Sequence, residues 1–559
     1  MKQKRKNEQP AKNITSSVVS LYLMVILAIF PLYYKYQYAD MGDTKYKMFL
    51  YSSVICVVVF FVYVIFKNIF LPKDSNNTVN KQSIKTIIRS NITTLDASVI
   101  LYFVCTTISF LCSSFIEKGF WGSDGWYMGY LSQFLFIAVF FLIAKGWNYQ
   151  KWAVQVLLAS SAIVFLVAVF HRFDVDILNI YGELAVKYKV LFLSTMGQSS
   201  WYSSFLCTVF PVGLYLFFIS ENKKVRKMAG VYSVIAMCSL VTQNTDSAFM
   251  ALFAVIMVLF YLSYENKKKQ FFETIILVFG SFCFMGICQR IFADRVIPLD
   301  TMSLFMSQSV LVWIMLVAAI GGYFIVAYNE NKKNAEGKKQ LTDNRKSIAD
   351  RNSVVSEEKA ANRVAFWILL GTIGIGVIGT IIFIVLNTNG FLLERFGYQS
   401  TNNYLLFDTQ WGNGRGFSWQ FAVTSFVEFP FFRKFIGVGP DCFSAYVASV
   451  PEYLEQMKVF WGDLVLTNAH NEYLTKLYNL GIIGLLSYLG MLGTAVGTFL
   501  KYRKENPFLP AFALCTVSYM VHNIFCYEQV CCTPFFYILM GIGSSLIHKK
   551  NINVHTSSD

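Results

Sequence analysis

Long apolar runs recur along the whole 559-residue chain and decide what it can fold into. A run of about twenty apolar residues crosses the ~30 Å hydrocarbon core of a bilayer as an α-helix. Such a helix satisfies its own backbone polar groups, which is the condition for burial in lipid. The composition agrees, because 55% of the residues are hydrophobic and only 14% are charged. The sequence therefore predicts an all-α, polytopic integral membrane protein.

About fourteen of these runs qualify as membrane-spanning helices, each ~20 residues long. Their limits follow from the return of charged and turn-forming residues between them. We expect transmembrane helices at residues 15–34, 48–66, 95–116, 127–144, 152–171, 200–220, 229–243, 247–264, 272–289, 303–328, 364–386, 480–500, 508–526 and 530–547.

The basic residues are distributed unevenly between the loops that join these helices. With the amino terminus placed in the cytoplasm, roughly two thirds of the 48 Lys and Arg residues fall in inner segments, the side that such residues favour. We therefore expect both termini in the cytoplasm and every basic residue in a loop. The net charge of +15 is spread over these short clusters, so a nucleic-acid partner is not expected.

Charged residues are almost absent from the predicted spans, with Asp96 and Asp246 at helix ends as the main exceptions. Ion pumps and many transporters keep such residues inside the helix bundle. Chemistry is therefore expected at the outer surface. The inner segment Asn329–Arg363 is rich in Lys, Asn, Glu and Ser and is predicted to be a disordered cytoplasmic linker.

The segment 387–479 is predicted to be one large extracytoplasmic loop, which divides the chain into 1–386, 387–479 and 480–559. A connection of this length is uncommon without a functional reason. Its pattern predicts a turn at Gly412–Gly416, an amphipathic helix at Phe417–Phe429, a turn at Gly437–Pro440 and a short helix at Pro451–Lys458.

His470 is the first candidate for a catalytic residue. Thr467 or Asn468 is a good helix N-cap, which would place His470 in the first turn of the helix leading to the twelfth span. The positive end of the helix dipole disfavours an imidazolium there, and a neutral imidazole can act as a general base. The plainer alternative is a capping or interfacial histidine without chemistry.

Arg415 is the second candidate, because a guanidinium group can bind a diphosphate through two parallel hydrogen bonds. Helical spacing places it on one face with Trp419. Arg395, Arg433, Arg290 and Arg295 are competitors on the same side of the membrane. A solvated loop arginine is the plainer reading of Arg415.

Taken in order, these segments resemble the O-antigen ligase and polymerase superfamily of polytopic bacterial membrane enzymes. The resemblance rests on GRGFSWQFAVTSF at the start of the loop, FIGVGPDCF after it, NAHNEYLTKLYNLGIIG at its end and the late HNIFCYEQVCCTPFFYILMG. It covers residues 194–543 unevenly and is densest at 414–484.

The resemblance implies a glycosyltransferase of the bacterial cytoplasmic membrane that uses a polyprenyl-diphosphate-linked glycan donor. Arg415 would hold the diphosphate, His470 would take a proton from the acceptor hydroxyl, and the transfer would invert the anomeric centre without a metal or cofactor. Trp419 and Glu472 are expected to bind substrate. The acceptor would be a glycan, a lipid or a protein, and both ligase and polymerase fit the sequence.

This chain departs from the family pattern at a middle helix, where 244–248 lacks the usual Ser-Arg pair. A second phosphate contact is therefore expected from Arg290, Arg295 or Arg172.

Other functions compete with this one. A lipid-linked oligosaccharide flippase would also have about fourteen helices, although it would have no reason for a long structured outer loop. Asp174 and Asp176 could hold Mg²⁺ in a metal-dependent glycosyltransferase, since carboxylate oxygens suit that ion. A structural scaffold for envelope assembly is a third alternative, but no sequence feature supports it.

Overall fold

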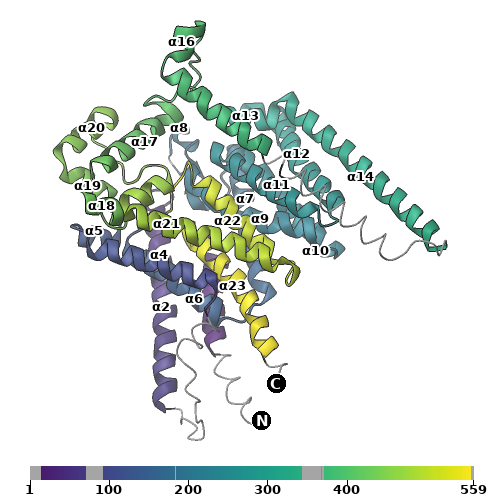
Figure 1. The fold of residues 1–559 in the computed structure, drawn as a ribbon, viewed down its shortest axis with the longest axis horizontal. Helices are drawn as coiled ribbons and strands as arrows, with labels where there is room; N and C mark the ends of the chain where they lie inside the picture. The colour runs from purple at the N-terminus through teal and green to yellow at the C-terminus, as the bar shows by residue number, and fades with distance from the viewer. Residues whose placement is uncertain (1–13, 71–91, 183, 343–366, 368–370, 556–559) are drawn as a thin grey trace. The chain divides into compact units, whose positions relative to one another are not determined.

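The computed structural model describes residues 14–70, 92–182, 184–342, 367 and 371–555. Most of these form helices (Figure 1), and the strands among them are one small antiparallel pair, β1 (Phe192–Leu193) and β2 (Gly197–Gln198). The prediction of an all-α chain is therefore confirmed.

Ten helices in the described part of the chain are long and apolar enough to cross a membrane. Four shorter apolar helices lie at Ile14–Ile29, Tyr130–Gly146, Leu509–His522 and Thr533–Ile547. Each predicted span overlaps one of these helices. The number of actual crossings stays a prediction, because helix length and composition alone do not place a membrane.

The chain divides into two compact units, which are described separately. Unit 1 comprises residues 1–255, 281–309 and 428–559, and unit 2 comprises residues 256–280 and 310–427.

Unit 1 contains most of the apolar helices. In chain order they are η1 (Val25–Ile29), α2 (Met41–Phe70), α4 (Thr94–Leu111), α5 (Ile116–Trp121), α6 (Tyr130–Phe141), η2 (Leu142–Gly146), α7 (Lys151–Arg172), α8 (Val186–Lys189), η3 (Ser194–Met196), α9 (Ser199–Ile219), α10 (Lys223–Thr242), most of α11 (Asp246–Ser263), the end of α12 (Lys268–Ile291), η4 (Ala293–Arg295), α13 (Thr301–Gln308), α18 (Phe431–Ile436), α19 (Phe443–Ser449), α20 (Pro451–Trp461), α21 (Glu472–Lys501), η5 (Tyr502–Lys504), α22 (Leu509–His522) and α23 (Thr533–His555).

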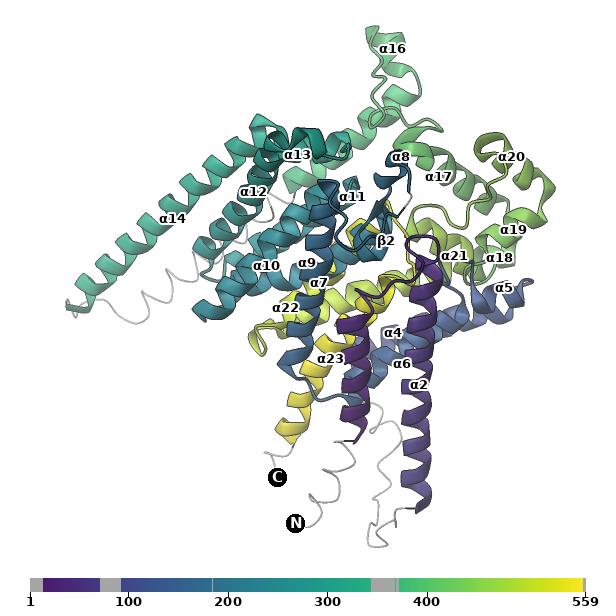
Figure 2. The ribbon, with the colours of Figure 1, turned by 180° about the vertical axis from the view of Figure 1, so that it is seen from behind.

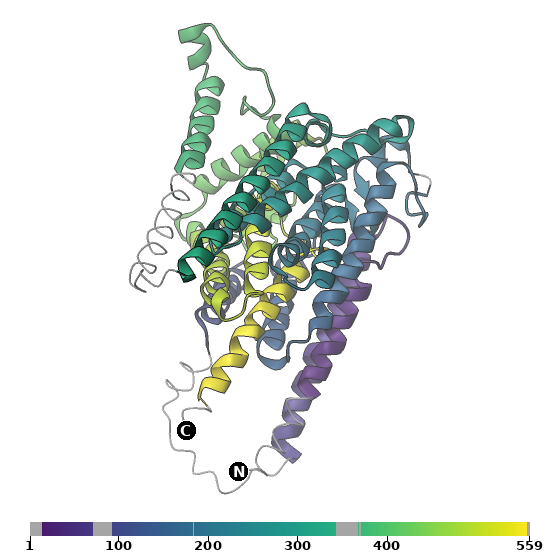
Figure 3. The ribbon, with the colours of Figure 1, turned by 90° about the vertical axis from the view of Figure 1, so that its right-hand side faces the viewer.

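The core of unit 1 lies around α9, which packs against α7, α10, α22 and α23. α4 and α21 lie side by side (Figure 1), and their contact brings a segment near residue 100 against one near residue 480. The helix at Ile14–Ile29 and α2 run antiparallel (Figures 2 and 3). The first helix begins at the same end of the unit at which α23 ends (Figure 2).

Unit 2 contains the start of α12, α14 (Val310–Thr342), a helix at Gly371–Thr388, α16 (Phe391–Phe396) and α17 (Trp411–Glu428). The predicted disordered linker at 329–363 is wrong over its first part, because α14 continues to Thr342. Lys, Glu, Gln and Ala are good helix formers, so the helix continues after its apolar residues end. Residues 343–363 lie outside the described residues.

Two buried lysines that were expected in outer loops lie inside helices. α2 begins at Met41 and α21 at Glu472, earlier than the predicted starts at 48 and 480. The buried ammonium of Lys45 donates to the carbonyl oxygens of Phe30 and Pro31. Lys476 is paired with two carboxylates. These partners offset the free-energy cost of burying each charge. Counting the basic residues in the loops could not predict such partners.

Two glycines bring α18 into contact with a break inside α21. Gly437 and Gly481 both have left-handed backbone conformations, with φ of 74° and 69°. A Cβ atom on Gly481 would lie 2.3 Å from the backbone carbon of Phe435, and one on Gly437 would lie 2.2 Å from the carbonyl oxygen of Asn479. The N–H of Gly439 also donates to that oxygen at 2.9 Å. Only glycine fits at either position.

We predict that Gly481→Ala lowers the free energy of unfolding by about 2–5 kcal/mol, because it adds backbone strain to a backbone clash. The thermal midpoint of the protein in detergent measures this loss. Gly490→Ala is the matched control, since a Cβ there meets no atom within 4 Å. If the two variants melt alike, the close packing at Gly481 does not contribute to stability.

Candidate functional site

His470 lies immediately before α21 rather than in its first turn. Asn471 is the N-cap, and its side chain accepts a hydrogen bond from the N–H of Leu474. The predicted caps, Thr467 and Asn468, are therefore wrong. Asn468 instead accepts from the N–H of His470 at 2.9 Å, which holds His470 in a left-handed conformation with φ of 52°. Three cap-forming residues stand within five positions, so the sequence did not decide between them.

The half-buried ring of His470 packs edge-on against Tyr527, with ring centroids 5.1 Å apart. The loop that carries His470 is attached to α21, because the N–H of Ala469 donates to the hydroxyl of Thr475 at 3.1 Å. The N–H of Glu472 donates to the carbonyl oxygen of Asn523 at 3.0 Å. These bonds fix the His470 loop against the segment 523–532.

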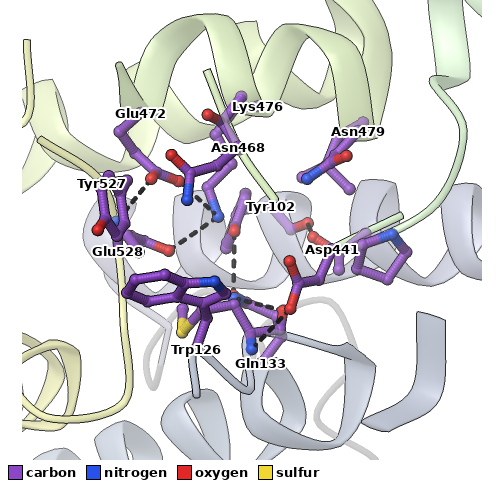
Figure 4. A pocket seen from close by; sticks show the side chains of 15 residues that line it. Tyr102, Trp126, Gln133, Asp441, Asn468, Glu472, Lys476, Asn479, Tyr527 and Glu528 are labelled. Atoms are coloured by element: carbon purple, nitrogen blue, oxygen red, sulfur yellow. Dashed lines mark hydrogen bonds and ion pairs between the residues drawn. The ribbon is translucent and has the colours of Figure 1, made fainter. Parts of the chain in front are cut away.

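A buried ionic cluster adjoins this loop in the chain and consists of Glu472, Lys476 and Glu528 (Figure 4). The ammonium of Lys476 lies 3.2 Å from Glu472 Oε1 and 2.8 Å from Glu528 Oε2. The N–H of Glu528 donates to Glu472 Oε2 at 2.7 Å. Glu472, expected to bind substrate, therefore has both carboxylate oxygens engaged within the protein.

Aromatic residues complete the surroundings of the ionic cluster. The hydroxyls of Tyr488 and Tyr519 donate to Glu528 Oε1 at 2.9 and 3.1 Å. The ammonium of Lys476 also lies over the rings of Tyr102 and Tyr488, 5.6 and 5.2 Å from their centroids. The charged groups thus exchange water for polar and π-electron partners on every side that the structure describes.

A small cavity of about 30 Å³ adjoins the cluster and is bordered by Trp126, Gln133, Asp441, Asn468 and Tyr527 among others (Figure 4). A water molecule needs about 10–15 Å³ on this scale. The cavity therefore has room for two or three waters and none for a sugar ring, so a glycan substrate would lie outside it.

Asp441 closes one side of this cavity and is buried. One of its carboxylate oxygens accepts from the N–H of Ser123 at 2.6 Å and from the N–H of Met128 at 3.1 Å. Burial raises the pKa of Asp441 to about 6, although these two hydrogen bonds act in the opposite direction. Asp441 thus connects the loop after α5 with the turn that precedes α19.

Arg415 and Trp419 belong to unit 2, whereas His470 and Glu472 belong to unit 1. Gly412, Asn413 and Gly414 have φ of 59°, 61° and 85°, so the predicted turn is confirmed and the helix proper follows it. The guanidinium of Arg415 donates to the carbonyl oxygen of Gly412 at 2.8 Å. Trp419 packs against Trp411, with ring centroids 5.2 Å apart.

The three arginines proposed as a second phosphate contact differ in exposure. Arg172 is buried, and its guanidinium donates to the carbonyl oxygens of Thr242, Ile297 and Pro298. Arg290 is exposed and donates to the carbonyl oxygen of Gln308 at 3.0 Å, and Arg295 is exposed in η4. Arg172 therefore joins segments of unit 1, whereas Arg290 and Arg295 remain accessible.

Asp174 and Asp176 have separate partners in the loop after α7. Asp174 pairs with Lys189 at 2.6 Å. Asp176 accepts from the N–H groups of Ile180 and Tyr181 and lies 3.3 Å from His171. Within the described ranges, no group of three or more His, Cys, Asp or Glu side chains is placed to hold a metal ion.

Sequence reasoning missed Lys476, Glu528 and Asp441. The i,i+4 spacing of Glu472 and Lys476 was a usable signal for a pair on one helix face. Glu528 stands in a very short connection between two apolar runs, where a carboxylate is costly unless it is paired. Asp441 had no such signal, because a turn after Gly-Pro ordinarily exposes its aspartate.

Residues 296–489 match the family model for the O-antigen ligase. The expected resemblance to the O-antigen ligase superfamily is therefore confirmed, and it supports glycan transfer of the ligase or polymerase type. The matched range includes Arg415, Asp441, His470 and Lys476. No curated protein sequence matches the chain.

The O-antigen ligase match places the ionic cluster partly inside and partly outside the family segment. Glu472 and Lys476 lie within residues 296–489, and Glu528 lies beyond them. The helices α4, α6 and α22, which surround the cluster, also lie outside the match. The candidate site therefore depends on parts of the chain that the family model does not cover.

We predict that Asp441 makes the protein less stable as the pH rises from about 4 to about 6. Its pKa is raised from 3.8 to about 6, so the folded protein binds this proton more tightly than the unfolded chain. The contribution of Asp441 to the free energy of unfolding is complete below pH ~4 and is lost as the pH rises through ~6. Asp441→Asn removes this contribution and keeps an acceptor for both N–H groups. Thermal midpoints of both proteins between pH 4 and 7 test this, and parallel curves would contradict it.

Proposed function

We propose that this protein is a membrane glycosyltransferase that transfers or polymerises a polyprenyl-diphosphate-linked glycan onto an acceptor hydroxyl. The reaction takes place at the extracytoplasmic face of a bacterial cytoplasmic membrane, without a metal or cofactor. The observation that carries the proposal is the O-antigen ligase match, whose residues 296–489 include both candidates that the sequence singled out, Arg415 and His470.

In this reaction the acceptor oxygen attacks the anomeric carbon of the donor from the side opposite the diphosphate. The new C–O bond forms as the bond to the diphosphate oxygen breaks, and the anomeric centre is inverted. The imidazole of His470 takes the proton of the acceptor hydroxyl, and the guanidinium of Arg415 stabilises the charge on the leaving diphosphate.

The surroundings of the two residues suit these roles. The half-buried His470 ring stands on a loop tied to buried parts of unit 1, and fixed orientation is what a general base needs. Arg415 is half-buried at the start of a helix, where one nitrogen of its guanidinium donates to the carbonyl oxygen of Gly412. The proposed mechanism requires both residues to contact the same donor molecule.

The acceptor distinguishes a ligase from a polymerase. A ligase would use a lipid, a protein or a wall polymer, whereas a polymerase would use the growing glycan. Both would draw the donor from the membrane, because a polyprenol chain keeps the diphosphate at the lipid surface. Candidate acceptors supplied one at a time to the reconstituted protein separate the two functions.

We predict that Arg415→Ala and His470→Ala each abolish transfer from a polyprenyl-diphosphate glycan in reconstituted membranes. Loss of a general base alone costs about 10²–10⁴ in rate. Arg395→Ala and Leu464→Ala are the matched controls, because both side chains are exposed in the same loop region, and both should retain activity. Full activity in either test variant would remove that residue from the mechanism. Movement of the glycan lipid across the membrane without transfer would favour a flippase.

We also predict that residues 415 and 470 face the outside of the cell. Cysteines placed there in a Cys112→Ser background should react with a membrane-impermeant maleimide in intact cells, since Cys112 is the exposed native thiol in the described part of the chain. Arg226→Cys, in a predicted inner segment, should react only after the cells are permeabilised. The reverse pattern would leave the proposed reaction without a substrate.

A further inference from the structure

The cluster of Glu472, Lys476 and Glu528 places two carboxyl groups beside one ammonium group inside the protein. All three side chains are buried, with exposed fractions of 2%, 6% and 4%. Two carboxylates and one ammonium leave one uncompensated charge if all three ionise. Desolvating such a group costs several kcal/mol, so a cluster of this kind is weak support for stability alone.

The cluster connects two segments that are distant in sequence. Glu472 and Lys476 occupy the first turns of α21, and Glu528 lies between α22 and α23. Tyr488, farther along α21, and Tyr519, at the end of α22, both donate to Glu528. The position of Glu528 is therefore set from both neighbouring helices, and in turn it fixes the start of α21.

The residues adjacent to the cluster in sequence form the surroundings of His470. Tyr527 precedes Glu528 and presents its ring edge-on to the His470 imidazole. Asn471 lies between His470 and Glu472 and caps α21. Because the N–H of Glu528 donates to Glu472 at 2.7 Å, the two backbones that carry His470 and Tyr527 are joined through this carboxylate.

We propose that Glu472, Lys476 and Glu528 are positioning residues, which hold the His470 imidazole against Tyr527 in the orientation that the transfer needs. They do not contact the substrate, because the adjoining cavity of about 30 Å³ is too small for a sugar and their oxygens are already engaged. This inference rests on the proposed function and adds to it the groups that determine where the base stands.

Glu528→Gln is the sharpest test of this role. The glutamine keeps the shape of the side chain, and its amide oxygen can still accept from Tyr488 and Tyr519, but the NH2 group that replaces Oε2 cannot accept from Lys476. Lys476 and Glu472 then remain as a neutral pair, so we expect the variant to fold. We expect kcat to fall about 10–100-fold, the range for a small misplacement of a reacting group, while KM stays within about twofold.

Two further variants keep the test decisive. Tyr527→Leu removes the ring beside His470, and the double variant Glu528→Gln/Tyr527→Leu should be no slower than the slower single variant, because both changes act on the same orientation. Glu472→Gln also leaves a neutral pair, with Glu528 at 2.8 Å from Lys476, and replaces Glu528→Gln if the latter does not fold.

Asp96→Asn is the matched control for removing a buried carboxylate. Asp96 pairs with Lys145 at 2.5 Å near the start of α4. The α4 residue that contacts the cluster is Tyr102, whose ring centroid lies 5.6 Å from the Lys476 ammonium. Asp96 precedes Tyr102 by six positions, or ~9 Å along the helix at 1.5 Å per residue. Because Asp96 pairs with Lys145 and not with a member of the cluster, Asp96→Asn should leave kcat unchanged.

The outcomes separate the two proposals. No transfer by the wild-type protein with any acceptor would defeat the proposed function itself. With an active wild type, an unchanged kcat in Glu528→Gln, a rise in KM alone, or multiplying effects with Tyr527→Leu would each overturn the positioning role. A melting-temperature loss in both Glu528→Gln and Glu472→Gln that exceeds the loss in Asp96→Asn would also overturn it, in favour of a purely structural cluster.

Discussion

The ammonium of Lys476, shared between Glu472 and Glu528, is the interaction on which the candidate site depends. In an apolar helix bundle a charge is tolerated only where it is paired, so each member of the cluster fixes the place of the others. The start of α21 and the connection between α22 and α23 are thereby joined beside His470. Because α4 packs along α21, the position of the cluster is also tied to α4 within unit 1.

The same constraint explains which parts of the fold the sequence could predict. Helices such as α7 and α9 follow directly from apolar runs, because length and hydropathy are properties of one segment. The ends of the helices were harder to predict from the sequence. Lys45 was expected in a loop because basic residues are ordinarily excluded from membrane-spanning helices. Its ammonium is buried because it donates to the carbonyl oxygens of Phe30 and Pro31, a contact that hydropathy does not predict. A helix can begin earlier than its apolar run when a distant partner accepts the charge.

The candidate site shows the same division between local and distant information. His470 and Arg415 were found from sequence because each stands in a short motif whose order and spacing are visible. The role of Glu528 was not visible, because its partner Lys476 lies 52 positions earlier in the chain. Asn471 rather than Asn468 caps α21, a choice that depends on Asn468 bonding to the His470 backbone instead. Sequence patterns therefore indicated the proposed reacting groups, whereas contacts across the fold determine how His470 is held.

This separation has a physical consequence for the proposed reaction. Arg415 donates to the turn immediately before it, whereas His470 is held by a hydrogen bond within its own loop and by a ring contact with Tyr527, in a second segment of unit 1. A general base must be aligned with the proton it removes, whereas a guanidinium group can bind a diphosphate from several directions. The residue with the stricter geometric requirement is thus the one with the more rigid surroundings. Orientation of the base, rather than its mere presence, is therefore where the fold contributes most to the transfer.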